Sequence, residues 1–327
     1  MTTWCRADFA GGTLDIWPLG LLHRGSRTIN VALDLAVEVR INPRLRGYAV
    51  VQDGERLEAE NLEALAVAPG GALVAAVGIV EALPPCEVEI SSASPRGGGL
   101  GASSALAVGL LAASEILRTG AMTRTPAQRA AVARDVEAQL MGLPTGLQDH
   151  YPAQLGGALE ISHHPGGEQV ESLAVDLDAL GDHLILGFTG LSHFSAGANW
   201  QVVRRRLEGD PFIVERLAEI AGVASQVSEA LVTSDWNRVG GLLREEWSAR
   251  RQLSAEISTP EIEALLASAA ACGAWGGKAC GAGGGGSVLV VAPPAVRPAI
   301  TDAWRRQGTQ ILAARPTSRR LESTKES

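Results

Sequence analysis

The chain has 327 residues, of which 46% are hydrophobic and 20% are charged, and its formal net charge is −8. This size allows one large domain or two ordinary ones, and the composition is typical of a globular protein with a sizeable core. The acidic balance and the lack of long basic runs argue against a nucleic-acid surface as the main activity, and no apolar run is long enough to cross a membrane.

The first part of the chain predicts strands followed by a buried helix. Residues 28–41 carry an apolar side chain at every second position, which is the period of a half-buried strand. Residues 48–58 and 86–92 predict further strands. A glycine-rich stretch at 95–101 then leads into residues 103–117, which are long and apolar enough to form a buried helix.

The next helix has clear start and stop signals. Thr125 is the candidate N-cap, Pro126 occupies the first helical position, and Gln128 completes a capping box. Gly142 follows the last helical residues and predicts the end of the helix.

Helices dominate the chain after about residue 195. Strands at 156–163 and 183–190 precede them. The predicted helices cover residues 198–210, 211–232, 236–253 and 259–274. A second glycine tract at 281–286 then leads into a strand at 287–292.

Strands mixed with helices predict an α+β fold with two halves. The polar, glycine-bearing segment 165–182 is the expected join. We therefore expect one domain at 1–175 and a second at 176–327, which ends in a polar tail.

Residues 95–106, PRGGGLGASSAL, place a glycine-rich turn directly before the first long helix. Glycine lets backbone N–H groups approach a ligand closely, and a helix start offers unpaired N–H groups and the positive end of the helix dipole. Phosphates bind at such places. A turn that is needed only for close packing is the structural alternative.

Two other types of phosphate loop fit this sequence less well. A Walker A loop requires G-K-[ST], but the glycine stretch has no lysine and residues 277–279 read G-K-A. A dinucleotide-binding loop would use Gly97, Gly99 and Ala102. That fold needs a strand and an acidic residue after its first helix, whereas here a second helix follows.

Several motifs resemble one known superfamily. Residues 95–105 fit P-x-x-x-G-L-G-[SA]-S-[SA]-A and resemble the phosphate loop of the GHMP kinases, the superfamily of galactokinase, homoserine kinase, mevalonate kinase and phosphomevalonate kinase. Residues 6–15, RADFAGGTLD, resemble the substrate motif of its sugar kinases. Residues 28–34 and 247–254 are similar to segments of its heptose 7-phosphate kinase branch, and residues 274–291 are similar to its closing glycine motif.

The segment 135–157 carries two candidate functional carboxylates. Glu137 lies on an otherwise apolar helix face, where a carboxylate needs a cation or hydrogen bonds unless it reaches solvent. The segment resembles the part of the GHMP kinases that holds the Mg²⁺-binding glutamate and the catalytic aspartate. Asp149 matches this aspartate, and the following His150 replaces the usual glutamine. We assign no role to His150.

The resemblance implies a two-domain GHMP kinase fold, with an N-terminal mixed sheet covered by helices and a C-terminal ferredoxin-like α/β sandwich. It also implies ATP and Mg²⁺ as cofactors. The implied site residues are Asp149 and Arg6 for catalysis; Gly97, Gly98, Gly99, Leu100, Gly101, Ala102, Ser103 and Ser104 for the ATP phosphates; Ser103 and Glu137 for the metal; and Gly11, Gly12, Thr13, Asp15, Gly283 and Gly284 for the substrate.

The implied reaction is transfer of the ATP γ-phosphoryl group to a sugar hydroxyl, with the anomeric C1 hydroxyl of a heptose 7-phosphate as the expected acceptor. Asp149 would accept the proton, and Arg6 would keep this carboxylate ionised by lowering its pKa. An unphosphorylated sugar is an alternative acceptor, because His193 and Ala196 replace an arginine and a serine of the heptose branch. An inactive sugar sensor and a dehydrogenase are further alternatives.

The sequence also carries expectations about environment and partners. The four cysteines form no C-x-x-C pair and follow no signal peptide, which favours a reduced, cytoplasmic location. The expected partner is a small-molecule sugar, without nucleic acid or membrane, and a homodimer is left open.

Overall fold

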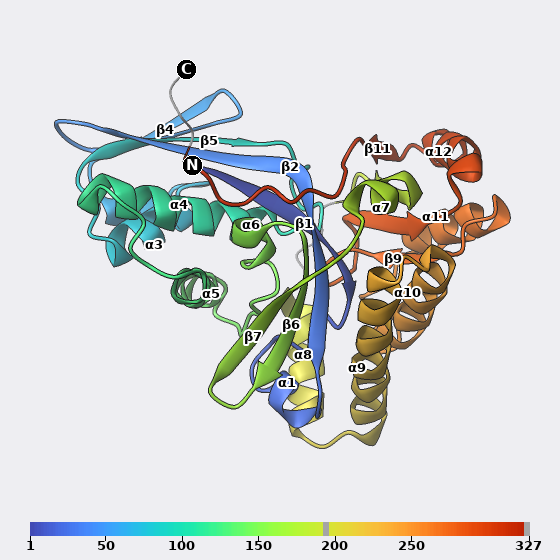
Figure 1. The fold of residues 1–327 in the computed structure, drawn as a ribbon. Helices are drawn as coiled ribbons and strands as arrows, with labels where there is room; N and C mark the ends of the chain where they lie inside the picture. Colours follow the sequence, from blue (N-terminus) through green and yellow to red (C-terminus); the bar gives the residue numbers. More distant parts are fainter. Residues whose placement is uncertain (192–195, 324–327) are drawn as a thin grey trace.

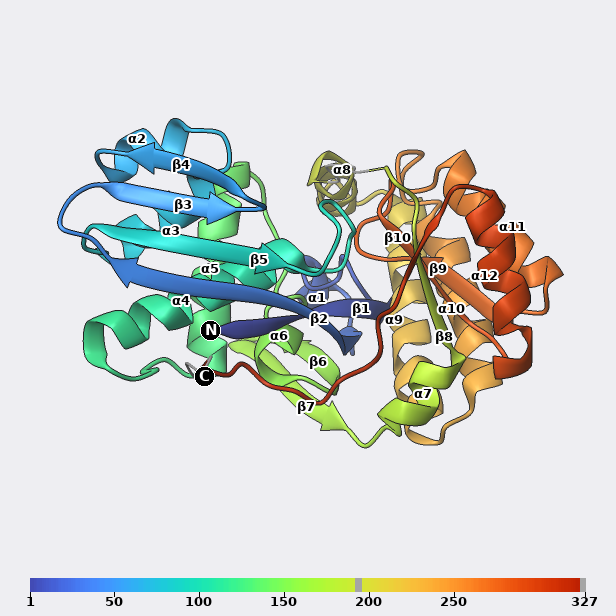
Figure 2. The same ribbon diagram turned by 90° about the horizontal axis from the view of Figure 1, so that it is seen from above.

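The computed structural model describes residues 1–191 and 196–323 and arranges them as two halves that lie side by side (Figure 1 and Figure 2). Each half has one β-sheet with helices packed against it, so the expected α+β class is confirmed. Within the described ranges, no helix is both long and apolar enough to cross a membrane.

The first half is built on a seven-stranded sheet with the order β4-β3-β5-β2-β6-β7, in which β1 also pairs with β2. The pair β3 and β5 is parallel and the other pairs are antiparallel, so the sheet is mixed, as expected. Its strands are β1 (Thr2–Ala10), β2 (Arg27–Pro43), β3 (Tyr48–Gln52), β4 (Glu55–Ala59), β5 (Cys86–Ser92), β6 (Ala158–His164) and β7 (Gly167–Leu173).

The long strand β2 organises this sheet. Its first part pairs with β6, its second part pairs with β5, and β1 lies antiparallel to it. The strand predicted at 28–41 is therefore confirmed. The single strand predicted at 48–58 is wrong, because Asp53 and Gly54 both adopt positive φ and form the tight turn of a hairpin.

Most helices of the first half lie on one face of this sheet (Figure 1), whereas the first helix packs through Leu19 into a buried cluster with the second half. The capping box of Thr125 and Gln128 and the helix end at Gly142 are confirmed. The helices are α1 (Leu19–Leu22), α2 (Leu62–Val67), α3 (Ala72–Val80), α4 (Ala102–Thr119), α5 (Pro126–Met141) and α6 (Pro152–Leu155).

The second half has a four-stranded antiparallel sheet with the order β11-β8-β10-β9. Its strands follow the β-α-β-β-α-β order of the expected ferredoxin-like sandwich, except that four helices instead of one connect its first two strands. The strands are β8 (Leu184–Phe188), β9 (Gly276–Ala279), β10 (Ser287–Val291) and β11 (Gln310–Leu312). The helices are α7 (Leu177–His183), α8 (Ala196–Leu207), α9 (Pro211–Val232), α10 (Trp236–Arg250), α11 (Pro260–Ala271), a short 3₁₀ turn η1 (Pro294–Val296) and α12 (Arg297–Arg306).

The expected join at 165–182 is not a plain loop. It contains β7, which forms a hairpin with β6, and the short helix α7. Strand β7 lies at the edge of the sheet and exposes much of its surface, so its composition is polar and resembles that of a linker. The boundary at 175/176, which falls between β7 and α7, stays a prediction.

The two halves are joined by packing and by a returning segment. Residues of β1 and β2 share one buried cluster with residues of α9, α10 and β10. The C-terminal strap, residues 313–322, leaves β11 and runs back along the first half (Figure 2). There the amide of Gly157 donates to the carbonyl of Thr317 at 2.7 Å, and the indole of Trp4 donates to the carbonyl of Arg320 at 3.0 Å.

Candidate active site

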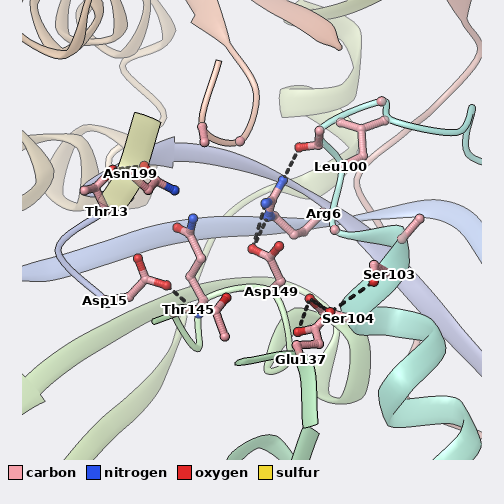
Figure 3. A pocket seen from close by; sticks show the side chains of 18 of the residues that line it. Arg6, Thr13, Asp15, Leu100, Ser103, Ser104, Glu137, Thr145, Asp149 and Asn199 are labelled. Carbon is pink, nitrogen blue, oxygen red and sulfur yellow. Dashed lines mark hydrogen bonds and ion pairs between the residues drawn. The ribbon is translucent and has the colours of Figure 1, made fainter. Parts of the chain in front are cut away.

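A cavity of about 340 Å³ lies where the two halves meet, beside the glycine-rich loop (Figure 3). We call one side the glycine-loop wall; it consists of residues 97–104 and Glu137. We call the other side the Thr13 wall; it consists of Thr13, Asp15, Gln148, Asn199 and Arg250. Arg6 and Asp149 lie between the two walls (Figure 3).

The glycine-rich loop has a backbone that ordinary side chains would not permit. Gly97, Gly99 and Gly101 all have positive φ. A Cβ at Gly99 would lie 2.6 Å from the carbonyl oxygen of Cys280, so this glycine also allows close contact with the second half. The loop thus packs closely against the second half at Gly99 and also leaves its backbone accessible to a ligand in the cavity.

Helix α4 begins at the cavity. Its N-cap is Gly101, which offers no side chain to the first turn, and its first backbone bond runs from the Ala105 amide to the Gly101 carbonyl. The amides of residues 102–104 therefore have no partner within the helix. Together with the positive end of the helix dipole they suit a phosphate group, and all eight predicted phosphate-loop residues line the cavity.

Glu137 projects from α5 toward the start of α4. Its carboxylate accepts a hydrogen bond from the Ser103 hydroxyl at 3.1 Å, and the Ser104 hydroxyl lies 3.0 Å from its second oxygen. Burial alone would raise the pKa of Glu137, but the charge of His150 and these hydrogen bonds outweigh it and lower the pKa. The carboxylate is therefore ionised at neutral pH.

His150 is the functional neighbour that the sequence did not reveal. Its Nε2 lies 2.8 Å from the carboxylate of Glu137, and the ring is buried. Burial alone would lower the pKa of His150, but the adjacent Glu137 outweighs it and raises the pKa. The upward shift favours the protonated imidazole, whose charge opposes that of the Glu137 carboxylate beside it.

The oxygen atoms around Glu137 fit Mg²⁺. One carboxylate and the hydroxyls of Ser103 and Ser104 are hard donors, and Mg²⁺ is commonly held by one or two carboxylates together with substrate phosphates. In the part of the chain that the structure describes, no group of three or more His, Cys, Asp or Glu residues could hold a metal alone. The donor set therefore suits a metal that arrives with a phosphate ligand.

Asp149 and Arg6 form the centre of the cavity. The Nε of Arg6 donates to Oδ1 of Asp149 at 2.8 Å, and its Nη1 donates to the Gly99 carbonyl at 2.6 Å. Burial raises the pKa of Asp149, and the charge of Arg6 only partly opposes the rise. Arg6 lowers the pKa of Asp149, as expected, but desolvation of the carboxyl group is the larger effect, so the net shift is upward.

On the Thr13 wall, Asp15 is anchored to the loop that carries Asp149. Its Oδ2 accepts a hydrogen bond from the Gln148 amide at 3.1 Å, and its carboxylate lies so close to Gly146 that a Cβ there would collide with it. Burial raises the pKa of Asp15, which these polar contacts and nearby arginines only partly oppose. The wall thus presents a fixed carboxyl group to the cavity.

Of the residues predicted to bind the substrate, four lie in the described part of the chain but do not line the cavity. Gly11 packs against the carbonyl of Arg27. Gly12 lies one residue before Thr13, outside the lining. Gly283 and Gly284 pack against Ile257 instead, and the lining from that tract is Gly281 and Ala282. His193 lies outside the described residues.

The structure adds two residues from distant helices to the Thr13 wall. Asn199 of α8 lies 3.5 Å from the Thr13 hydroxyl, through its Oδ1. Arg250, at the end of α10, donates to the same hydroxyl at 3.1 Å. The motif at 247–254 was the one available signal for Arg250, and no signal pointed to Asn199.

Two family models match the chain. One is the GHMP kinases N terminal domain, over residues 65–157, and the other is GHMP kinases C terminal, over residues 227–310. Together they cover more than half of the chain.

Individual relatives agree with these models. A D-glycero-alpha-D-manno-heptose 7-phosphate kinase from Campylobacter jejuni is 26% identical over 221 residues, which are 65% of this chain and 63%, or less than two thirds, of that relative. A galactokinase from Mycobacterium tuberculosis is 28% identical over 270 residues, which are 72% of each chain. The crystal structure of a D-glycero-D-manno-heptose 1-phosphate kinase from Bacteroides thetaiotaomicron has a TM-score of 0.76 at 18% identity, covering 98% of this chain and 99% of that one.

Proposed function

The chain belongs to the GHMP kinase family, and we propose that it transfers the γ-phosphoryl group of ATP to the anomeric C1 hydroxyl of a sugar. One observation carries this proposal. The Asp149–Arg6 pair lies between a wall suited to phosphates and Mg²⁺ and a wall lined with hydrogen-bonding side chains. A carboxylate in this place can accept a proton from a hydroxyl group held on the Thr13 wall.

The residues divide the work by position. Amides at the start of α4 hold the phosphates, and Ser103 with Glu137 would hold Mg²⁺. When bound, ATP and Mg²⁺ supply the phosphoryl group and neutralise its charge. Asp149 takes the proton of the attacking hydroxyl, and its raised pKa makes it a stronger base once it is ionised. Asp15 orients the sugar by accepting hydrogen bonds from the hydroxyl groups of the sugar.

The acceptor we propose first is a heptose 7-phosphate or a related sugar. Support comes from the similarity to a Campylobacter jejuni kinase that is named for this substrate. The second candidate is an unphosphorylated sugar, and a specific observation favours it. The lining cations among the described residues are Arg6 and Arg250, and both already form ion pairs, with Asp149 and Glu246 respectively. A terminal phosphate would need another donor.

The test is a screen of ATP consumption with hexoses, heptoses and their terminal phosphates, followed by NMR of the product to locate the new phosphate. Asp149→Asn is the control for turnover that does not depend on the proposed base. Phosphate at C1 of any of these sugars supports the proposal, and phosphate at another position contradicts it. A tenfold higher kcat/KM for a free sugar than for its terminal phosphate selects the second candidate.

An inactive sugar sensor and a dehydrogenase would give different results when the same sugars are tested for binding and with an added nicotinamide cofactor. A sensor would bind a sugar without consuming ATP. A dehydrogenase would change the absorbance of a nicotinamide cofactor. Either result would overturn the proposed kinase activity.

A further inference from the structure

Six charged side chains form a continuous row of alternating sign from the centre of the cavity to the far end of the Thr13 wall. Five of them are at most 3% exposed. In order, they are Asp149, Arg6, Asp8, Lys278, Glu246 and Arg250. The row has three positive and three negative members, so each buried charge has an opposite neighbour.

The contacts along the row cross from one half of the molecule to the other. Asp8 of β1 lies 3.7 Å from Arg6 and 2.7 Å from the Nζ of Lys278, which belongs to β9. The same Nζ lies 3.5 Å from the carboxylate of Glu246 on α10. Glu246 in turn accepts a hydrogen bond from the Nε of Arg250 at 2.8 Å. The row therefore fixes Arg250 relative to the first half.

Stability alone gives little reason for such a row. Buried ion pairs often contribute no more than well-packed apolar residues, because desolvation offsets the attraction between the charges. The row does fix the orientation of Arg250. Because one edge of its guanidinium group is bound to Glu246, the other edge can point in only one direction. Here that edge faces the segment between β1 and α1.

Arg250 binds two consecutive residues of this segment. Its Nη2 donates to the Gly12 carbonyl at 2.8 Å, and its Nη1 donates to the Thr13 hydroxyl at 3.1 Å. Thr13 has a φ of 77°, a left-handed conformation that is an outlier for a β-branched residue. Such a conformation persists only where the surroundings enforce it. Arg250 supplies two of the bonds that do so.

We infer that Arg250 is a positioning residue, which holds Gly12 and Thr13 in the conformation that binds the acceptor. It acts through these two residues and does not touch the reacting atoms. This inference rests on the proposed function only in that the Thr13 wall receives the sugar.

The first test compares the kinetics of Arg250→Lys with those of wild type. Lysine keeps a positive charge beside Glu246 but cannot bind Gly12, Thr13 and Glu246 together. We expect the KM for the acceptor sugar to rise at least tenfold, while the KM for ATP and kcat change less than threefold. The matched control is Arg251→Lys, the neighbouring arginine, which pairs with Glu263 at a more exposed position. An acceptor KM within twofold of wild type would overturn the inference.

The second test needs no activity and covers the case in which Arg250→Lys does not fold. Hydrogen exchange is measured in wild type, Arg250→Lys and Thr13→Val, because valine loses the hydroxyl that Arg250 binds and leaves the buried row intact. We expect faster exchange in residues 11–16 of each folded variant and unchanged exchange in residues 97–105. Unchanged exchange at 11–16, or equal acceleration in both segments, contradicts the inference. If wild type phosphorylates no sugar, the proposed function fails, and this exchange comparison still decides the role of Arg250.

Discussion

The two walls of the cavity are built from different stretches of chain and use different atoms. The glycine-loop wall comes from one turn, the first residues of α4 and a single carboxylate on α5, and it offers mainly backbone amides. The Thr13 wall takes its five side chains from four stretches of chain, two of which, α8 and the end of α10, belong to the other half. Backbone amides depend on local geometry, whereas the Thr13 wall depends on contacts between the halves.

This difference teaches which changes each wall can tolerate. A phosphate held by amides is recognised without regard to side chains, so the same loop can serve many acceptors. In the proposed function, acceptor choice falls to the Thr13 wall, where Asn199 and Arg250 contact the Thr13 hydroxyl and the backbone amide of Gln148 holds Asp15. A substitution there should change the acceptor preference and leave ATP binding intact.

The largest effect is expected at Asp149, which belongs to neither wall. Asp149→Asn should lower kcat by about 10²–10⁴, because a positioned proton acceptor contributes that much. ATP affinity and thermal stability should change little. In wild type, activity should fall as the pH drops through the raised pKa of this carboxylate, since only the ionised form accepts a proton. Turnover of the variant near the wild-type rate would contradict the assignment.

A second, smaller effect is expected on the glycine-loop wall. Glu137→Gln and Ser103→Ala should each raise the Mg²⁺ concentration that gives the half-maximal rate. For Glu137→Gln we expect a rise of roughly tenfold, because loss of one residue that supports a metal site typically weakens metal affinity by about this factor. Glu160→Gln, which removes a carboxylate outside the cavity, is the control. Metal titrations with Mg²⁺ and Mn²⁺ measure the effect. If Glu137→Gln titrates like the control, Glu137 is not a metal ligand.

The corresponding change on the Thr13 wall is Asp15→Asn. We expect the KM for the acceptor to rise about tenfold, equivalent to about 1.4 kcal/mol, while the KM for ATP stays within twofold. Steady-state kinetics with each substrate varied in turn measures the split. A rise in the KM for ATP instead would show that the two walls are not separate in function.

The smallest effect is on stability and involves His163, which packs under α1 against Gly20. Burial lowers the pKa of His163 from 6.5 to about 4. Between these values the unfolded chain binds a proton that the folded chain does not, so stability falls as the pH drops from 6.5 to 4, by at most ~1.4 kcal/mol per pH unit. His163→Gln should remove this component of acid sensitivity.

Urea unfolding at pH 7, 5.5 and 4.5 measures this difference, with His164→Gln at the neighbouring exposed position as the control. Because α1 begins at Leu19, soon after Asp15 in the chain, the Thr13 wall should loosen in acid before the glycine-loop wall does. Parallel stability curves for wild type and His163→Gln would contradict this expectation.

The sequence was informative where function is local. Residues 97–104 and the start of α4 lie within one short stretch, so the glycines, the small residues and the apolar helix could be recognised together. The capping box of α5 is local in the same sense. Strand β7 escaped prediction because an edge strand exposes its side chains and therefore carries polar residues.

The residues that could not be predicted are those that act through tertiary contacts. The hydrogen bond between Arg250 and Thr13 joins residues 237 positions apart, and that between Thr13 and Asn199 joins residues 186 positions apart. No periodicity or spacing reports such a pair. His150 is different, because it lies inside a matched motif, but its role depends on how α5 directs Glu137 toward it.

The C-terminal strap has a mechanical consequence. The chain enters the second half after β7 and leaves it through residues 313–322, which bind again to the first half. The second half is therefore connected to the first by the chain at two points, in addition to the packing between the halves. A body with one tether can swing in any direction, whereas two tethers leave rotation about the line that joins them. Because a buried cluster of β1, β2, α9, α10 and β10 also joins the halves, any widening of the cavity with the strap bound would have to separate residues of this cluster.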